Sequence, residues 1–305
     1  MLAPRGANGF GYGSTAEDVT SKLDLHGKTI LVTGCNSGLG LETMRVLRKR
    51  GAHVIGTART KQKADDAAAG LGSQSGPFTG AACELSDPKS VRWCVAEIQS
   101  KGTKLDAIMA NAGIMALPKL ETAHGYELQF FTNHVGHFLL VTGLLAQLTD
   151  KGRVVMTSSE AHRRAYEGGV QLDNLDGKKG GYTAWGAYGQ SKMANILFAK
   201  KLAKKLEGTA KTANALHPGV IRTNLTRHSS LAAIAMSIAS PLVLKSVAEG
   251  AATQTYLAVH PSVEGVSGKY FSNCQILTPR REAEDAALAD ALWTKTEEIV
   301  ASLPG

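Results

Sequence analysis

The stretch that decides the fold is "KTILVTGCNSGLGLETMRVLRKRG", residues 28–51. Its opening, KTILVTG, is a short apolar run with β-branched side chains and a final glycine, which predicts a buried strand. From Gly38 onward the apolar residues recur at helical spacing, and Gly51 suits the C-cap of that helix. The stretch therefore predicts a strand, a glycine-rich turn and a helix in direct succession.

The same alternation continues along the chain. Apolar runs without polar alternation, which suit strands buried on both faces, are found at 52–58, 78–85, 105–111, 152–159 and 212–219. Amphipathic stretches at about 61–71, 87–101, 121–148 and 184–206 predict the helices between them. Strand and helix thus alternate six times, which indicates an α/β fold with a doubly wound, Rossmann-type parallel sheet and helices on both faces.

The composition excludes several functional classes. The 305 residues are 43% hydrophobic and 20% charged, as expected of a globular protein with a sizeable core. The net charge is +8, but the basic residues are scattered and do not interleave with aromatic ones, so we predict no nucleic-acid partner. Pro241 interrupts the longest apolar segment, 230–244, so we predict no membrane span. The four cysteines lack metal-ligand spacing, so we expect reduced thiols in a cytoplasmic protein without a metal site.

The chain shows no linker and no internal repeat. We therefore predict a single domain over residues 25–305, preceded by an N-terminal extension over 1–24 that lacks the apolar core of a signal peptide. Residues 160–183 are rich in Gly, Lys and Asp and predict a long loop. The apolar segment 225–245 lacks strand signals, and we expect it to form a lid over a substrate pocket.

The turn "TGCNSGLG" (33–40) lies where a dinucleotide's pyrophosphate would bind, between the first strand and the first helix. A glycine at 34 permits a tight turn, one at 38 a close backbone approach, and one at 40 close packing of the helix on the strand. The spacing is Gly-x3-Gly-x-Gly rather than GxGxxG, and a purely structural turn is the alternative. Its position favours cofactor binding by Gly34, Asn36, Ser37, Gly38, Leu39 and Gly40.

The end of the second strand bears on the choice of cofactor. An acidic residue at that place would hold the ribose 2′-hydroxyl of NAD. This chain has Ala58 there, followed by Arg59, with Lys61 and Lys63 nearby. Because a guanidinium pairs with a 2′-phosphate and a carboxylate would repel it, we predict NADP rather than NAD. The alternative is that Arg59 is only a surface charge.

A second stretch, "AYGQSKMAN" (187–195), carries groups suited to proton transfer. Tyr188 lies four residues before Lys192 in a predicted helix, so both side chains lie on one face. Ser159 ends the predicted strand at 152–159, and such strand ends are where doubly wound sheets bind ligands. An ammonium about 4 Å away supplies about 4 kcal/mol at an effective dielectric of about 20, enough to lower a phenol pKa by roughly 3 units. We therefore expect Lys192 to lower the pKa of Tyr188.

Taken together, these motifs resemble those of the short-chain dehydrogenase/reductase family over about residues 24–300. TGxxxGxG is present as "TGCNSGLG", the fourth-strand motif as "NAG" (111–113), YxxxK as "YGQSK" and PGxxxT within "HPGVIRTNL" (217–225). Three further segments are similar in sequence to members of the retinol dehydrogenase branch, including the related WW-domain oxidoreductases: "TNHVGHFLL", "SSEAHRR" and "GKYFSNC".

The resemblance implies a set of site residues. The catalytic set would consist of Asn133, Ser159, Tyr188 and Lys192. Lys192 would also bind the nicotinamide ribose, and Asn133 would hold a water that leads to Lys192. Glu84 stands where the family usually has Asp beside the adenine. The resemblance extends the cofactor contacts to Glu84, Leu85, Asn111, Ala112, Gly113, Tyr188, Lys192, Pro218, Gly219 and Thr223.

The predicted function is hydride transfer between NADP(H) and a carbonyl or alcohol carbon of a small lipophilic substrate. A nucleotide-sensing interaction protein and an epimerase with the same tetrad are alternatives. A serine hydrolase is disfavoured because no GxSxG elbow is present. The helices predicted at 121–148 and 184–206 are long, and the resemblance implies that they form a dimer seam, so we also predict a homo-oligomer.

Overall fold

The sheet is built outward from β1 (Thr29–Thr33), the strand of the opening stretch. In the computed structural model, which describes residues 5–73, 76–221 and 244–304, eight strands form one sheet in the order β10-β9-β8-β7-β4-β1-β2-β3. Neighbouring strands pair parallel except β10 with β9. The other strands are β2 (His53–Ala58), β3 (Phe78–Ala82), β4 (Leu105–Ala110), β7 (Leu148–Thr157), β8 (Thr212–Leu216), β9 (Tyr270–Ser272) and β10 (Gln275–Ile276).

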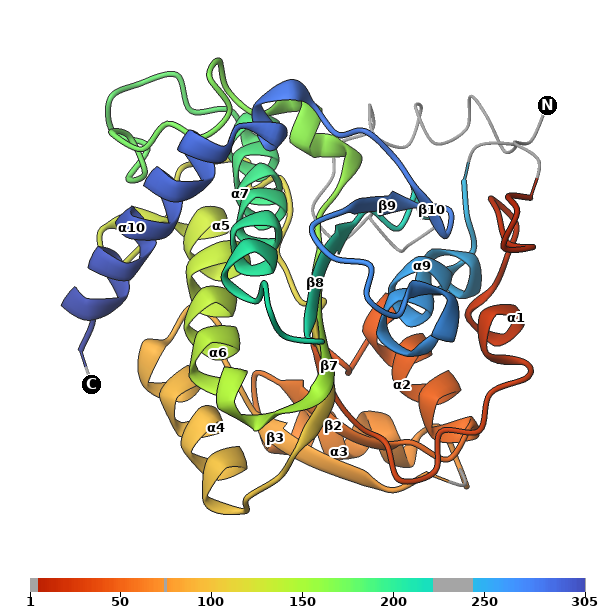
Figure 1. The fold of residues 1–305 in the computed structure, drawn as a ribbon. Helices are drawn as coiled ribbons and strands as arrows, with labels where there is room; N and C mark the ends of the chain where they lie inside the picture. The colour runs from red at the N-terminus through yellow and green to blue at the C-terminus, as the bar shows by residue number, and fades with distance from the viewer. Residues whose placement is uncertain (1–4, 74–75, 222–243, 305) are drawn as a thin grey trace.

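Helices cover both faces of this sheet (Figure 1). One face carries α4 (Pro88–Ser100), α6 (Gly136–Leu144) and α7 (Ala184–Lys205), and the other carries α2 (Gly38–Lys49), α3 (Lys61–Ala69) and α9 (Val247–Val259). The strands alternate between the two cores: Leu31 packs with the first set of helices, and Ile30 and Val32 pack with the second. This confirms the doubly wound α/β fold, since a strand covered on both faces must be apolar throughout.

Shorter elements complete the described part of the chain. They are α1 (Ala16–Thr20), the hairpin β5 (Thr122–Ala123) and β6 (Tyr126–Glu127), α5 (Leu128–Phe130), the π-helical η1 (Phe131–Val135), the 3-10 turns η2 (Leu145–Gln147), η3 (Glu160–Arg164), η5 (Pro261–Val263) and η6 (Arg281–Glu284), and α10 (Ala286–Ser302). Thr223 and residues 225–243 of the expected lid lie outside the described residues.

The sequence prediction and the structure differ in several places. The single helix predicted over 121–148 is divided into the hairpin β5–β6, α5, η1, α6 and η2. The helices α1, α9 and α10 and the strands β9 and β10 were not predicted. Nearly every side chain of α9 from Gly250 to Ala258 is buried, because the sheet covers one side and α1 and α2 the other. A helix buried all round has no polar face, so it lacks the amphipathic pattern by which helices are predicted.

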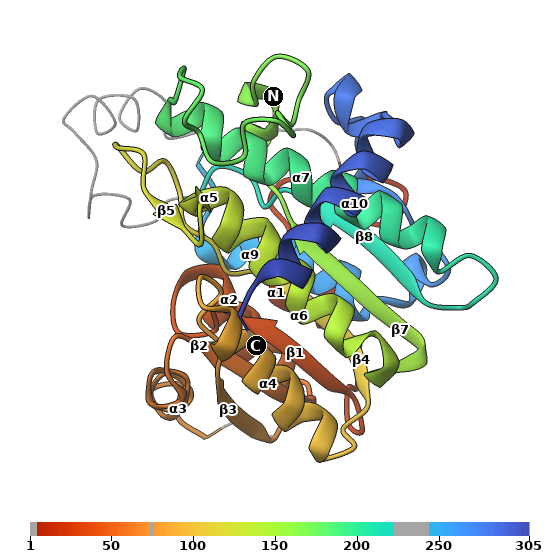
Figure 2. The same ribbon diagram turned by 90° about the vertical axis from the view of Figure 1, so that its left-hand side faces the viewer.

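The C-terminal helix α10 packs across α6 and α7 (Figure 2). The Trp293 ring lies 4.8 Å from that of Phe138 on α6 and 5.4 Å from that of Phe198 on α7, centroid to centroid. Thr296 Oγ1 lies 3.0 Å from His134 Nε2. The helix α10 therefore covers the outer side of α7, which carries Tyr188 and Lys192, and it also contacts η1, which carries Asn133.

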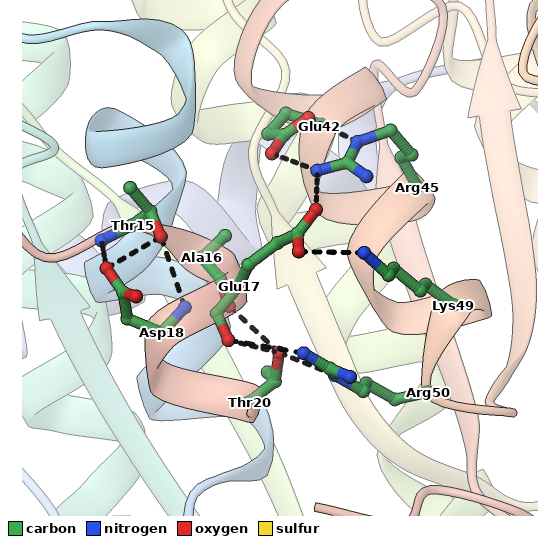
Figure 3. A network of polar contacts seen from close by, with 9 residues as sticks. All are labelled: Thr15, Ala16, Glu17, Asp18, Thr20, Glu42, Arg45, Lys49 and Arg50. Atoms are coloured by element: carbon green, nitrogen blue, oxygen red, sulfur yellow. Dashed lines mark hydrogen bonds and ion pairs between the residues drawn. The ribbon is translucent and has the colours of Figure 1, made fainter. Parts of the chain in front are cut away.

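The N-terminal segment is tied to α2 by a polar network (Figure 3). Thr15 and Asp18 form a capping box that starts α1. Glu17 on α1 pairs with Arg45 at 2.6 Å and with Lys49 at 2.8 Å, both on α2. These two cations hold the pKa of Glu17 at about 2, below its ordinary value of 4.5.

We predict that Glu17→Gln makes the protein less stable at pH 7, because the folded state favours the ionised carboxylate. A group whose folded pKa is depressed stabilises above its unfolded pKa, and that stability is lost as the pH falls toward the folded value near 2. Glu17 is partly exposed, so solvent screening limits the loss to about 1 kcal/mol.

Urea denaturation at pH 7 and pH 3 tests this prediction, with Glu97→Gln as a control on an exposed ion pair with Lys101. The deficit of Glu17→Gln should shrink at pH 3, and Glu97→Gln should change little at either pH. A deficit of equal size at both pH values would contradict the assignment.

Candidate active site

The strand order reverses between β1 and β4, and their carboxyl ends are joined by hydrogen bonds. The backbone N–H groups of Asn111 and Ala112, just after β4, donate to Thr33 Oγ1 at 2.9 and 3.0 Å. Asn111 Nδ2 donates to Thr33 O at 2.8 Å. Ligands of doubly wound folds bind at such a reversal point, so the NAG turn and the glycine turn lie at the expected edge of the sheet.

The glycine turn has the geometry that requires glycine. Gly34 and Gly38 have φ angles of +68° and +54°, which are costly for residues with a Cβ. A Cβ on Gly40 would lie 2.1 Å from Gly34 O and 2.7 Å from Asn111 Nδ2. The N-cap of α2 is Ser37, whose side chain makes no capping bond to a described residue. The start of α2 thus retains uncapped N–H groups, which suit a phosphate. Asn36 and Leu39 flank this point.

The end of β2 places Arg59 at the surface. Ala58 is buried, and Arg59 follows it on the exposed side, before Thr60 caps α3. Lys61 is engaged by Asp65, whereas Arg59 makes no ion pair with any residue that the structure describes. A guanidinium is therefore available one residue after the strand end, where the 2′-substituent of a bound ribose is expected.

The residues predicted to lie beside the adenine follow β3. The Glu84 carboxylate accepts hydrogen bonds from Ser86, from its N–H at 3.2 Å and its Oγ at 2.9 Å. Leu85 is buried, and its carbonyl oxygen would lie 2.3 Å from a Cβ built on Gly136. Glu84 thus begins a local turn, which is closed by a hydrogen bond from Asp87 N–H to the Glu84 backbone oxygen, and Leu85 supports the start of α6.

Tyr188 and Lys192 are both buried on α7, one turn apart as predicted. Lys192 Nζ donates to Thr157 O at 3.1 Å and lies 5.7 Å from the centroid of the Tyr188 ring. Ser159 follows β7 and is the N-cap of η3, and its side chain interacts with that of Tyr188. The structure therefore brings the serine, the tyrosine and the lysine together.

Asn133 joins this group from the π-helical turn η1. Its Nδ2 donates to Ile114 O and to Ser191 Oγ, and its Oδ1 accepts from Ile114 N–H, each at 2.9 Å. A Cβ on Gly113 would lie 2.9 Å from Asn133 Oδ1 and 3.3 Å from Lys192 Nζ. The NAG turn, the asparagine and the lysine therefore meet at one point. Such π-helical turns occur frequently at functional sites.

The ionisation of the pair differs from our expectation. Burial raises the pKa of Tyr188 to about 12, although the nearby Ser159 side chain acts in the opposite direction. Burial also lowers the pKa of Lys192 to about 8. The prediction of a lowered tyrosine pKa was wrong for the protein's own groups, because desolvation of the phenolate outweighs the attraction of a cation whose hydrogen bond goes to Thr157.

The PGxxxT motif is only partly described. Pro218 and Gly219 follow β8, and the aliphatic part of Lys245 packs on Gly219, with Cδ 2.7 Å from a Cβ built there. Thr223 lies outside the described residues. The sequence-based prediction missed two residues that contact the predicted site, Lys245 beside Gly219 and Thr33, whose hydroxyl binds the NAG turn. The only sequence signal for Thr33 was its position as the first residue of the TGxxxGxG motif.

Metal ligands and membrane-spanning helices are both absent from the described ranges. These residues contain no group of three or more His, Cys, Asp or Glu side chains arranged to hold a metal ion. Within the same ranges, no helix has the length and apolar character needed to cross a bilayer.

Comparison with known proteins agrees with this geometry. A family model described as short chain dehydrogenase matches residues 28–171. The chain is 42% identical to short-chain dehydrogenase TIC 32 B, chloroplastic, of Brassica napus over 98% of this chain and 97% of that protein. It is 38% identical to human retinol dehydrogenase 14 over 92% and 88% of the two chains. A crystal structure of a protein from Mycobacterium paratuberculosis superimposes with a TM-score of 0.74 at 33% identity, covering 95% of this chain and 98% of that one. The chain therefore belongs to the short-chain dehydrogenase/reductase family, near its retinol dehydrogenase branch.

Proposed function

We propose that this protein transfers a hydride between NADP(H) and a carbonyl or alcohol carbon of a small lipophilic substrate, using Asn133, Ser159, Tyr188 and Lys192. The observation that carries the proposal is the meeting of these side chains with the NAG turn at the carboxyl edge of the sheet. Family membership makes the chain an oxidoreductase of a family that uses nicotinamide cofactors.

Each catalytic side chain has a role that follows from its surroundings. A nicotinamide bound at this site would supply or accept the hydride. Tyr188, protonated at neutral pH, donates a proton to the substrate oxygen during reduction. Ser159 hydrogen-bonds to the same oxygen and stabilises developing negative charge. Lys192, whose pKa of about 8 keeps it mostly cationic at pH 7, favours the tyrosinate that is left behind.

The cofactor contacts would come from the segments that follow the carboxyl ends of the strands described above. The uncapped start of α2 would hold the pyrophosphate, and Arg59 would pair with a 2′-phosphate. Ala58 carries no acceptor for a ribose 2′-hydroxyl, so the strand end lacks the group that NAD requires. The remaining contacts would come from Glu84, Leu85, the NAG turn, Pro218, Gly219 and Thr223.

The lipophilic substrate is supported by exposed apolar side chains beside the site. Trp185 is 43% exposed and meets the ring of Tyr188 edge to face at a centroid distance of 6.1 Å. Met115 is exposed next to Ile114, which Asn133 holds, and Val220 is exposed next to Gly219. Apolar side chains at the mouth of a polar site favour an apolar ligand, and the relative named retinol dehydrogenase 14 carries the name of a lipophilic alcohol.

Two alternatives use the same fold. A nucleotide-sensing interaction protein would bind NADPH without turnover, and an epimerase would return its cofactor unchanged. The convergence of four catalytic side chains favours turnover, because nucleotide sensing alone does not need it. A panel of lipophilic carbonyl compounds with NADPH, followed at the nicotinamide absorbance, separates the oxidoreductase from both.

A homo-oligomer and a cytoplasmic location stay predictions. The predicted seam on α6 and α7 is covered by α10, with Trp293 buried between them. We expect a second copy to contact α10 rather than those helices, and light scattering at micromolar concentration should give at least a dimer mass. A monomer mass would contradict this prediction.

We predict that Tyr188→Phe abolishes turnover, with a loss of at least about 100-fold, while NADPH still binds. The substitution keeps the buried ring and removes only the ionisable hydroxyl. Tyr166→Phe is the matched control, because Tyr166 accepts a hydrogen bond from Thr183 N–H and has no lysine one turn on. Near-normal turnover in Tyr188→Phe would remove this residue from the mechanism.

We predict that NADPH binds at least about tenfold more tightly than NADH at low salt. A charge-assisted hydrogen bond from Arg59 contributes about 1.5–3 kcal/mol, or roughly 10- to 150-fold in affinity. The double variant Ala58→Asp with Arg59→Leu should reverse the order, because the carboxylate repels the 2′-phosphate and accepts from a 2′-hydroxyl.

Fluorescence titration of both cofactors measures these affinities. Lys101→Met, which removes a cation at the amino edge of the strands, controls for a general effect of charge. Equal affinities of the unmodified protein for NADPH and NADH would overturn the role of Arg59.

A further inference from the structure

His137 is a fully buried histidine that none of the proposed catalytic steps uses. It lies in the first turn of α6, with no exposed surface. Its Nδ1 lies 2.9 Å from the backbone oxygen of Asn133, and its Nε2 lies 2.9 Å from Thr33 Oγ1. One imidazole therefore contacts both the turn that carries the catalytic asparagine and the end of the first strand.

The partners decide which nitrogen of His137 carries the proton. A carbonyl oxygen only accepts, so Nδ1 must be the donor, and the neutral ring then presents Nε2 as an acceptor. Thr33 Oγ1 already accepts from the N–H groups of Asn111 and Ala112. Its own proton therefore goes to His137 Nε2 rather than to the more distant Met109 O at 3.4 Å. Burial holds the pKa of His137 at about 4, so the ring is neutral at pH 7.

These bonds close a ring around the NAG turn. Thr33 holds its first two residues, and Asn133 holds Ile114 just after it through two bonds of 2.9 Å. His137 connects Thr33 and Asn133 to each other through its two ring nitrogens. The backbone of residues 111–114 is thus fixed at both ends, and Gly113 between them faces Lys192 Nζ.

We propose that His137 is a positioning residue that holds the NAG turn against Asn133 and Lys192. The backbone that contacts the cofactor and the side chains that transfer the proton then keep a fixed position relative to one another. This inference rests on the proposed function only for its effect on turnover. Without the imidazole, Thr33 loses its acceptor and Asn133 O loses a donor, and both ends of the turn loosen.

A purely structural role is the alternative, and the chain offers a matched control for it. His134 lies on the same helical segment three residues earlier, is equally buried, and is kept neutral by burial, with a pKa of about 3. Its Nε2 contacts Thr296 on α10 rather than the site. If buried histidines here serve only the core, removing either one should have the same consequences.

The experiment compares His137→Phe with His134→Phe by three measurements: hydrogen–deuterium exchange of the peptide covering residues 111–114, NADPH affinity by fluorescence titration, and kcat and KM with a carbonyl substrate. We expect His137→Phe to exchange at least about tenfold faster in that peptide, to bind NADPH several-fold more weakly and to lose at least about tenfold in kcat with little change in KM. His134→Phe should leave all three within about twofold. His137→Gln, whose amide has both a donor and an acceptor, should recover part of each loss.

Similar exchange in the two phenylalanine variants, or exchange in His137→Phe within twofold of the unmodified protein, would overturn the inference. Should His137→Phe fail to fold, His137→Gln takes its place, and exchange in the 111–114 peptide equal to that of His134→Gln would overturn the inference in the same way. If the unmodified protein shows no turnover, the proposed function fails, but the exchange measurement still decides the role of His137.

Discussion

The hydrogen bonds between Thr33 and the residues after β4 are the constraint on which the rest of the site depends. They bring the carboxyl ends of β1 and β4 together at the point where strand order reverses. Because Asn111 Nδ2 then lies against the start of α2, a Cβ at Gly40 has no room. The helix can approach the strand only with glycine there, and this approach places its N–H groups beside the NAG turn.

Burial of Tyr188 and Lys192 at this site disfavours the charged form of each side chain. A buried phenol with a raised pKa and a buried lysine with a lowered pKa both show that desolvation dominates this site. Neutral tyrosine at pH 7 is a proton donor, so in the function that we propose the protein's own groups favour the reduction of a carbonyl. Removal of a proton from an alcohol requires the tyrosinate, which further positive charge beside the pair would favour.

Much of the architecture could be predicted because its signals are local. All six predicted strands form, and the helices after β1, β2, β3 and β7 begin within a few residues of the prediction. What could not be predicted depends on tertiary contacts. The π-helical turn at Asn133 follows from bonds to Ile114 and Ser191, which are distant in sequence, and α9 has no polar face to mark it. The prediction of the Tyr188 pKa was wrong for a related reason. Spacing along a helix shows that two side chains are close, but the balance between burial and charge depends on all the groups that surround them.

The two ends of the chain explain how such a buried polar site can be held. On one face, α1 is fastened to α2 through Glu17, so the helix that begins at the glycine turn is supported from outside. On the other face, α10 covers α6 and α7 through Trp293, so the helices that carry His137, Tyr188 and Lys192 lie between two packed layers. Buried hydrogen-bonding groups need partners in fixed places, because an unmade bond there costs more than it would in water. The outer helices therefore belong to the machinery of the site, since they restrict the movements that would leave Asn133, His137 or Lys192 without a partner.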